Sequence, residues 1–138
     1  MEDNIFFYCA VIDRKFTLDQ WLKFEDKDAD KPVYIENEFI WNVHNVCINP
    51  HRIEINSDNG YVVVKTASAH GKWFVGADYS YRDNGGGSPC YYDIKKSYNS
   101  EKEAIIAGFK SLLKRKLSNY LLTSIKEKLF EQRQLSLF

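Results

Sequence analysis

The architecture of this chain is most clearly decided by the stretch HRIEINSDNGYVVVKT, residues 51–66. Polar and apolar residues alternate over residues 51–56, which is typical of a half-buried β-strand. The sequence Ser-Asp-Asn-Gly at residues 57–60 predicts a hairpin turn, because Asn-Gly accepts the positive φ angles that a tight turn needs. Residues 61–66 then predict the antiparallel partner strand.

More strands are expected on both sides of this hairpin. Residues 5–12 are rich in β-branched and aromatic residues and predict an N-terminal strand, whereas residues 33–47 are ambiguous. Residues 72–81 predict a third strand of the meander. One face of that strand carries Trp73, Val75, Ala77, Tyr79 and Tyr81. The glycine-rich residues 83–89 predict a flexible loop, and a short strand is expected over residues 90–96.

Helical patterns occur near both ends of the chain. Thr17 can cap a short N-terminal helix through residues 21–24, where apolar positions recur at helical spacing. Ser100 and Glu103 have capping-box spacing, so a second helix is expected to begin there. Its apolar stripe continues to residue 132, although the poor helix formers at residues 118–119 could interrupt it.

The order strand, helix, meander and long C-terminal helix predicts an α+β domain. We expect an antiparallel sheet of about three to five strands, with the long C-terminal helix packed on one face and a short N-terminal helix. The length of 138 residues predicts a single domain over residues 1–133, followed by a C-terminal tail over residues 134–138.

Composition excludes several classes of protein. A net charge of zero gives no global preference for nucleic acid or a membrane. No apolar run is long enough to span a bilayer, and the acidic residues 1–4 are unlike the start of a secretory signal. Cys9, Cys47 and Cys90 form no CxxC pair, so we expect no disulfide framework and a cytoplasmic protein.

Signals for catalysis or metal binding are weak. Residues 85–88 are glycine-rich but lack the GxxxxGK[ST] spacing of a phosphate-binding loop. Residues 44–51 hold two histidines and a cysteine, but zinc would need a fourth ligand from elsewhere. Nothing around Cys90 or His70 matches a catalytic signature. We therefore expect a protein that is not an enzyme and that has no metal, cofactor or small-molecule substrate.

Aromatic and basic residues are interleaved between residues 72 and 96. Single-stranded nucleic acid stacks on such surfaces when they share one sheet face. The residues proposed for this face are Lys72, Tyr79, Tyr81, Tyr92 and Lys95. The favoured alternative is that the tyrosines pack beneath the C-terminal helix while the lysines lie in water, because tyrosine is common in half-buried strands.

A second basic group lies in the last segment of the chain. It comprises Lys110, Lys114, Arg115, Lys116, Lys126, Lys128 and Arg133. This group is either a solvated helix face or a source of weak steering toward DNA or an acidic partner.

The chain ends in the apolar pentapeptide Gln134-Leu135-Ser136-Leu137-Phe138. Every position of this pentapeptide resembles the bacterial sliding-clamp-binding motif, Gln-Leu-(Ser/Asp)-Leu-Phe. Replication and repair polymerases and other clamp clients use that motif to dock on the β clamp of DNA polymerase III. Elsewhere, the glycine-rich segment, the short strand after it and the Ser-x-x-Glu-Ala-Ile helix start at residues 100–105 are similar to small uncharacterised proteins of plasmids, phages and conjugative elements.

The resemblance implies a role for each residue of the motif. Gln134 would make polar contacts in one subsite, and Leu137 and Phe138 would fill a hydrophobic subsite. Leu135 would be a lesser contact and Ser136 a polar spacer. The resemblance thus predicts an interaction protein that docks on the clamp as an accessory factor of replication, repair or a mobile element, or as an inhibitor.

A different arrangement of the same residues is also open. The pentapeptide could be a last helical turn in which Leu135 and Phe138 continue the apolar stripe of Leu129 and Phe130 onto the core. The alternative function is then a single-stranded nucleic-acid-binding module that uses the tyrosine and lysine face.

Overall fold

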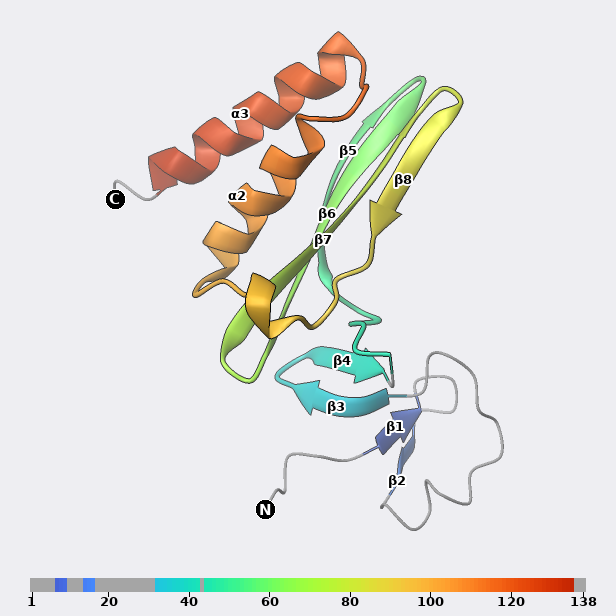
Figure 1. The fold of residues 1–138 in the computed structure, drawn as a ribbon, viewed down its shortest axis with the longest axis vertical. Coiled ribbons are helices and arrows are strands. Elements are labelled where there is room, and N and C mark those ends of the chain that lie inside the picture. Colours follow the sequence, from blue (N-terminus) through green and yellow to red (C-terminus); the bar gives the residue numbers. More distant parts are fainter. Residues whose placement is uncertain (1–6, 10–13, 17–31, 43, 136–138) are drawn as a thin grey trace.

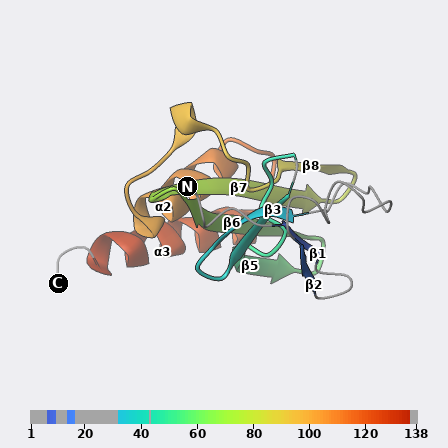
Figure 2. The same ribbon diagram turned by 90° about the horizontal axis from the view of Figure 1, so that it is seen from below.

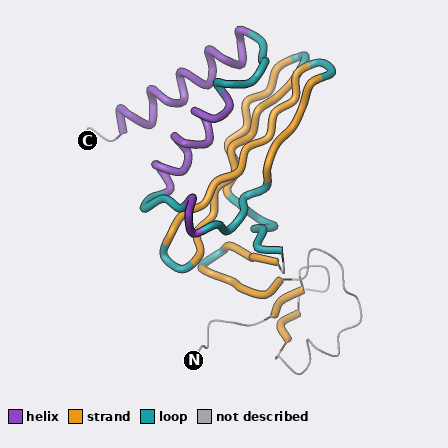
Figure 3. Tube along the Cα trace, viewed as in Figure 1, coloured by secondary structure: helices purple, strands orange, loops and turns teal. Residues whose placement is uncertain are grey.

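The structure, a computed structural model, describes residues 7–9, 14–16, 32–42 and 44–135. It has an α+β architecture built on a four-stranded antiparallel sheet in the order β5-β6-β7-β8 (Figure 1). These strands are β5 (His51–Ser57), β6 (Gly60–Ala69), β7 (Lys72–Tyr81) and β8 (Asn84–Ser88). Within the described residues, the helices α2 (Glu101–Leu112) and α3 (Asn119–Leu135) lie on one side of the sheet and run antiparallel to each other (Figure 3). The predicted α+β class and the antiparallel meander are therefore confirmed.

Smaller hairpins lie at one end of this sheet (Figures 1 and 2). The described residues place β1 (Phe7–Cys9) against β2 (Arg14–Phe16), and β3 (Pro32–Glu36) against β4 (Phe39–Asn42). The ambiguous residues 33–47 thus contain most of the second hairpin, whose turn includes Asn37 at φ 54°. The short N-terminal helix expected after Thr17 falls outside the described residues.

The hairpin predicted from residues 51–66 is present, but its turn differs from the expected one. Ser57 pairs with Gly60, so Asp58 and Asn59 occupy the turn itself. Neither of them has a positive φ, and the Ser57 hydroxyl closes the turn by donating to the Gly60 carbonyl at 3.0 Å. The positive φ angles occur at the next hairpin turn, where His70 and Gly71 have φ values of 54° and 77°.

Two expectations for residues 83–96 are wrong. Residues 84–88 are not a loop but form β8, which pairs with β7 from Ala77↔Ser88 to Tyr81↔Asn84. A Cβ atom at Gly86 would lie 3.2 Å from the Tyr79 ring, so glycine lets this edge strand fit against the tyrosine. The β7–β8 ladder ends at the Ala77↔Ser88 pair, and Pro89 follows it. Residues 90–96 accordingly form an isolated bridge between Tyr91 and Val46 and the 3₁₀ helix η1 (Ile94–Lys96) instead of a strand.

The single long C-terminal helix that we expected is two helices. The chain reverses over residues 113–118, and α3 begins after Ser118, whose hydroxyl accepts a hydrogen bond from the Leu121 amide at 3.2 Å. The reversal allows the apolar stripes of both helices to face one core. No helix in the described part of the chain is both long and apolar enough to cross a membrane.

The capping box predicted for α2 is present in part. The Ser100 hydroxyl accepts a hydrogen bond from the Glu103 amide at 3.2 Å, as the spacing predicts. The Glu103 carboxylate reaches back to the amide of Asn99 at 3.0 Å, one residue before the predicted partner. Both bonds satisfy amides that have no partner within the helix.

The sheet separates two apolar clusters. The helix-side core contains Ile55, Val62, Val64, Ile105, Phe109, Leu112, Leu117, Leu121, Ile125 and Leu129. The hairpin-side core contains Tyr34, Phe39, Trp41, Cys47, Ala67, Ala69, Phe74 and Cys90. Alternation along β6 produces this division, because Val62 and Val64 point to the helices whereas Ala67 and Ala69 point to the β3–β4 hairpin.

Substitution of Gly108 by alanine is expected to destabilise the domain by about 1 kcal/mol. A Cβ atom at this position of α2 would lie 2.8 Å from Val64 Cγ1 and 2.9 Å from Val75 Cγ2. Overpacking of this kind costs about 1–3 kcal/mol, whereas replacing a helical glycine by alanine gains about 1 kcal/mol. Urea unfolding of Gly108→Ala measures the balance, with the exposed Lys110→Ala as a control. A more stable Gly108→Ala protein would show that α2 is not packed so closely on the sheet.

Candidate functional site

The structure describes the first two residues of the C-terminal pentapeptide. Gln134 and Leu135 are the last two residues of this helix, and residues 136–138 fall outside the described part of the chain. Leu129 is buried in the helix-side core, but Phe130 is 62% exposed. The apolar stripe of α3 therefore includes Leu129 and excludes Phe130, contrary to the pattern that we expected.

The five residues proposed for a tyrosine and lysine face do not form one surface. Tyr79 and Tyr81 are half-buried and pack against the helix-side core. Tyr92 lies on the opposite side of the sheet, with its ring centroid 4.7 Å from that of Phe74. The remaining two residues are also apart from these tyrosines: Lys72 donates to Asn99 Oδ1 at 2.7 Å, and Lys95 belongs to η1.

Tyr79 and Tyr81 each lie beside an arginine: Arg82 directly follows Tyr81 in the sequence, whereas Arg115 comes from the distant loop between α2 and α3. The Arg115 guanidinium carbon lies 5.2 Å from the centroid of the Tyr79 ring, and that of Arg82 lies 5.1 Å from the centroid of Tyr81. Both distances are within the range of cation–π contacts. The reversal between α2 and α3 brings Arg115 to this place, because the loop that carries it lies at the same end of the sheet as the β5–β6 and β7–β8 turns (Figure 1).

We name this region the basic end. It comprises Tyr79, Tyr81, Arg82, Lys114, Arg115, Lys116 and Tyr120. An open pocket of about 390 Å³ lies between its turns and the start of α3. The pocket is lined by Asn56, Ser57, Asp58, Asn59, Tyr81, Ser118 and Tyr120. The basic end thus combines cations, tyrosine rings and a polar hollow.

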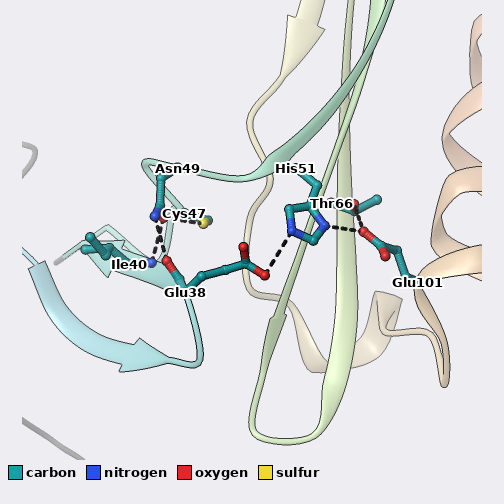
Figure 4. Close-up of polar contacts among 7 residues, drawn as sticks. All are labelled: Glu38, Ile40, Cys47, Asn49, His51, Thr66 and Glu101. Atoms are coloured by element: carbon teal, nitrogen blue, oxygen red, sulfur yellow. Dashed lines mark hydrogen bonds and ion pairs between the residues drawn. The ribbon is translucent and has the colours of Figure 1, made fainter.

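A second polar group surrounds His51 at the other end of the sheet (Figure 4). His51 Nδ1 lies 2.6 Å from Glu101 Oε2, and His51 Nε2 lies 3.0 Å from Glu38 Oε1. The Thr66 hydroxyl donates to the same Glu101 oxygen at 2.9 Å. Asn49 holds the backbone of Glu38 by donating to its carbonyl oxygen at 2.6 Å. We call Glu38, His51, Thr66 and Glu101 the histidine clasp, because they join the β3–β4 turn, the sheet and the first turn of α2.

The charge state of the clasp depends on His51. Its hydrogen bond with the Glu101 carboxylate raises the His51 pKa above its usual value, and Glu38 acts in the same direction, while partial burial opposes both. Both ring nitrogens face carboxylates, so each can donate when the imidazole is protonated. This arrangement fits a structural ion-pair group, and neither nitrogen is left to activate a nucleophile.

The two described cysteine side chains are buried and form no disulfide. Burial raises the pKa of Cys47 to about 11 and that of Cys90 to about 12. Since the thiolate is the reactive form, these thiols are poor nucleophiles near neutral pH. His70 stacks on the Tyr34 ring at a centroid distance of 4.4 Å. In the described part of the chain, no three His, Cys, Asp or Glu side chains are gathered as a metal site.

No protein-family model matches this chain, and neither a curated protein nor a solved structure is significantly similar to it. Function must therefore be argued from the chain's own residues. Two features outside the cores carry chemistry that a partner could recognise: the C-terminal pentapeptide and the basic end.

Proposed function

We propose that the protein docks on the β sliding clamp of bacterial DNA polymerase III through residues 134–138. The observation that carries this proposal is the complete match of Gln134-Leu135-Ser136-Leu137-Phe138 to the clamp-binding motif. The helix that leads to the motif supports it, because Phe130, Glu131 and Arg133 are exposed. A partner can thus approach the end of α3 without displacing the core.

The resemblance to the clamp-binding motif assigns a contact to each of its residues. The Gln134 amide makes polar contacts in one subsite of the clamp, while Leu137 and Phe138 fill a hydrophobic subsite. A few buried anchors supply most of the binding energy in such short peptides. Leu135 adds a lesser contact, and Ser136 is a polar spacer.

Docking in an extended conformation requires the last turn of α3 to unwind. Gln134 and Leu135 lie within that turn. The cost is small, because the last four carbonyl groups of a helix have no partner within the helix and helix ends fray. The ordering of the peptide still opposes binding, so the affinity is expected to be modest.

The proposed role is that of a non-enzymatic accessory factor of replication, repair or a mobile element, or of an inhibitor. As an inhibitor, the protein would compete with polymerases for the same pocket on the clamp. Addition of the protein to a clamp-dependent polymerase reaction separates the two: an inhibitor lowers primer extension, and an accessory factor leaves it intact at equal occupancy.

The test is binding to a purified bacterial sliding clamp, measured by calorimetry or surface plasmon resonance. The double substitution Leu137→Ala with Phe138→Ala is expected to weaken binding at least about 100-fold, since each removes a hydrophobic anchor. Phe130→Ala is the matched control, because it removes an exposed phenylalanine from the same helix outside the motif, and binding should be unchanged. Equal binding by the double variant and the parent protein would refute the proposal.

A further inference from the structure

We propose that the basic end of the domain binds single-stranded nucleic acid. This inference goes beyond clamp docking, because it uses different residues at the opposite end of α3. The binding surface consists of the loop between α2 and α3, the β7–β8 turn, the start of α3 and the glycine strand β8. Its chemistry differs from that of the tyrosine and lysine face predicted from the sequence, which the fold divides between two sides of the sheet.

The basic end carries four exposed cations. Arg82, Lys114, Arg115 and Lys116 are all exposed. None of these four cations takes part in an ion pair with another described residue. The neighbouring turns contribute two carboxylates, Asp58 and Asp83, so cations are in excess here although the whole chain has a net charge of zero. Unpaired cations of this kind attract phosphate groups.

Aromatic rings lie beside these cations at the basic end. The Tyr120 side chain is 60% exposed at the start of α3, beside the polar pocket. The Arg115 and Arg82 guanidinium groups lie over Tyr79 and Tyr81. Unstacked bases pack on tyrosine rings and on guanidinium planes alike. The basic end therefore offers stacking partners next to its phosphate-binding cations.

The glycine strand β8 offers backbone groups that do not pair with β7. Tyr81 and Asn84 close the two-residue turn between β7 and β8, so their pair is hydrogen-bonded and the pairs alternate from there. The amide and carbonyl groups of Gly85 and Gly87 therefore point away from β7. These glycines are exposed and have no side chain of their own, and the Asp78 carboxylate lies against Gly87. The free amides can donate to phosphate oxygens or base edges.

These features favour nucleic acid over an acidic protein segment. Cations alone would suit both partners, but stacking rings beside bare backbone donors match a chain of alternating bases and phosphates. Single strands are favoured over duplexes because the tyrosine rings need unstacked bases. Because α3 has 17 residues, the basic end and the C-terminal motif lie roughly 25 Å apart along the helix. The two surfaces could thus be occupied at the same time.

The test measures fluorescence anisotropy of a labelled 20-nucleotide oligo-dT at low salt, with the full chain and no clamp present. Lys114→Ala with Lys116→Ala is expected to weaken binding about tenfold or more. It should also reduce the slope of log K against log salt by about 1.4, which corresponds to two lost phosphate contacts on a single strand. The matched control is Lys95→Ala with Lys96→Ala, which removes the same charge elsewhere and should change binding less than about twofold.

Further variants distinguish the sources of binding. Tyr120→Ala should weaken binding but leave the salt slope unchanged, since it removes stacking and no charge. Leu137→Ala with Phe138→Ala should bind oligo-dT as the parent does, which keeps this proposal separate from clamp docking. The proposal is overturned by no binding at low salt, by equal losses in the two lysine pairs, or by tighter binding of a matched duplex or of polyglutamate. Circular dichroism melting of each variant checks that the fold is intact.

Discussion

Substitution of Phe109 by alanine is expected to lower the free energy of unfolding by about 3–5 kcal/mol. The Phe109 side chain is fully buried in the helix-side core, with 0% exposure, where α2 lies on the sheet. The loss combines the transfer free energy of the ring with the cavity that a rigid β-sheet cannot fill. A domain of this size is stable by only about 5–15 kcal/mol, so the variant should be close to unfolding.

Phe130→Ala provides the matched control for this effect. The chemical change is identical, but Phe130 is 62% exposed, so stability should change by less than about 0.5 kcal/mol. Urea unfolding followed by circular dichroism gives both values, and the slope of free energy against urea should be unchanged if the denatured state is unaffected. Equal losses in the two variants would mean that α2 is not the helix that seals the core.

The β5–β6 hairpin and the strand β7 could be predicted from local sequence because their signals are local. Polar and apolar residues alternate over residues 51–56, so one face of β5 packs on the core, and a slip by one residue would reverse the two faces. β8 could not be predicted in this way. Its glycines have no strand propensity, and they are strand-forming only because Tyr79 and the rest of β7 lie beside them.

The reversal between α2 and α3 was visible only as two poor helix formers at residues 118–119. Local propensity could not decide between one helix and two, because the apolar stripe continues on both sides of the break. Burial of Leu112 and Leu121 in the same core decides it, since one straight helix could not place both stripes over this small sheet. Tertiary packing therefore determines this feature.

The candidate surfaces were predictable to different degrees. The C-terminal motif is a contiguous pentapeptide, and its recognition needs no fold. The basic end joins β7, a hairpin turn and the α2–α3 loop, so its residues are far apart in the sequence. The sequence signals were Tyr79, Tyr81 and the run of cations at residues 114–116, but the meeting of Arg115 with Tyr79 depended on the helix reversal. The same limit applies to the histidine clasp, which joins residues separated by up to 63 positions between Glu38 and Glu101.

Substitution of Glu101 by alanine is expected to destabilise the domain by about 2 kcal/mol near pH 6. Glu101 Oε2 accepts hydrogen bonds from both His51 and Thr66. Thr66 is only 2% exposed, so loss of the acceptor leaves a buried hydroxyl unsatisfied, which costs about 1–3 kcal/mol. The contribution of the His51 bond is smaller than for a buried pair because the imidazole side chain is 42% exposed.

Glu38→Ala is the matched control within the clasp. Glu38 also faces His51, but its side chain is 63% exposed, so the solvent screens its ion pair and the expected loss is about 0.5 kcal/mol or less. A Glu38→Ala protein that loses as much stability as Glu101→Ala would mean that the charge of His51, and not the buried Thr66 hydroxyl, dominates the clasp.

The stabilisation of the fold that comes from the positive charge of His51 should weaken as the pH rises. The Glu101 carboxylate, followed by Glu38, raises the His51 pKa in the folded protein, so protonated His51 stabilises the fold fully below the unfolded pKa of about 6.5. That stabilisation is lost as the pH rises through the folded pKa. Glu101→Gln retains an acceptor for Thr66 but removes the charge, so its deficit against the parent should be larger at pH 6 than at pH 9. Urea unfolding at both pH values measures this difference, and a deficit that grows with pH would show that neutral His51 is the stabilising form.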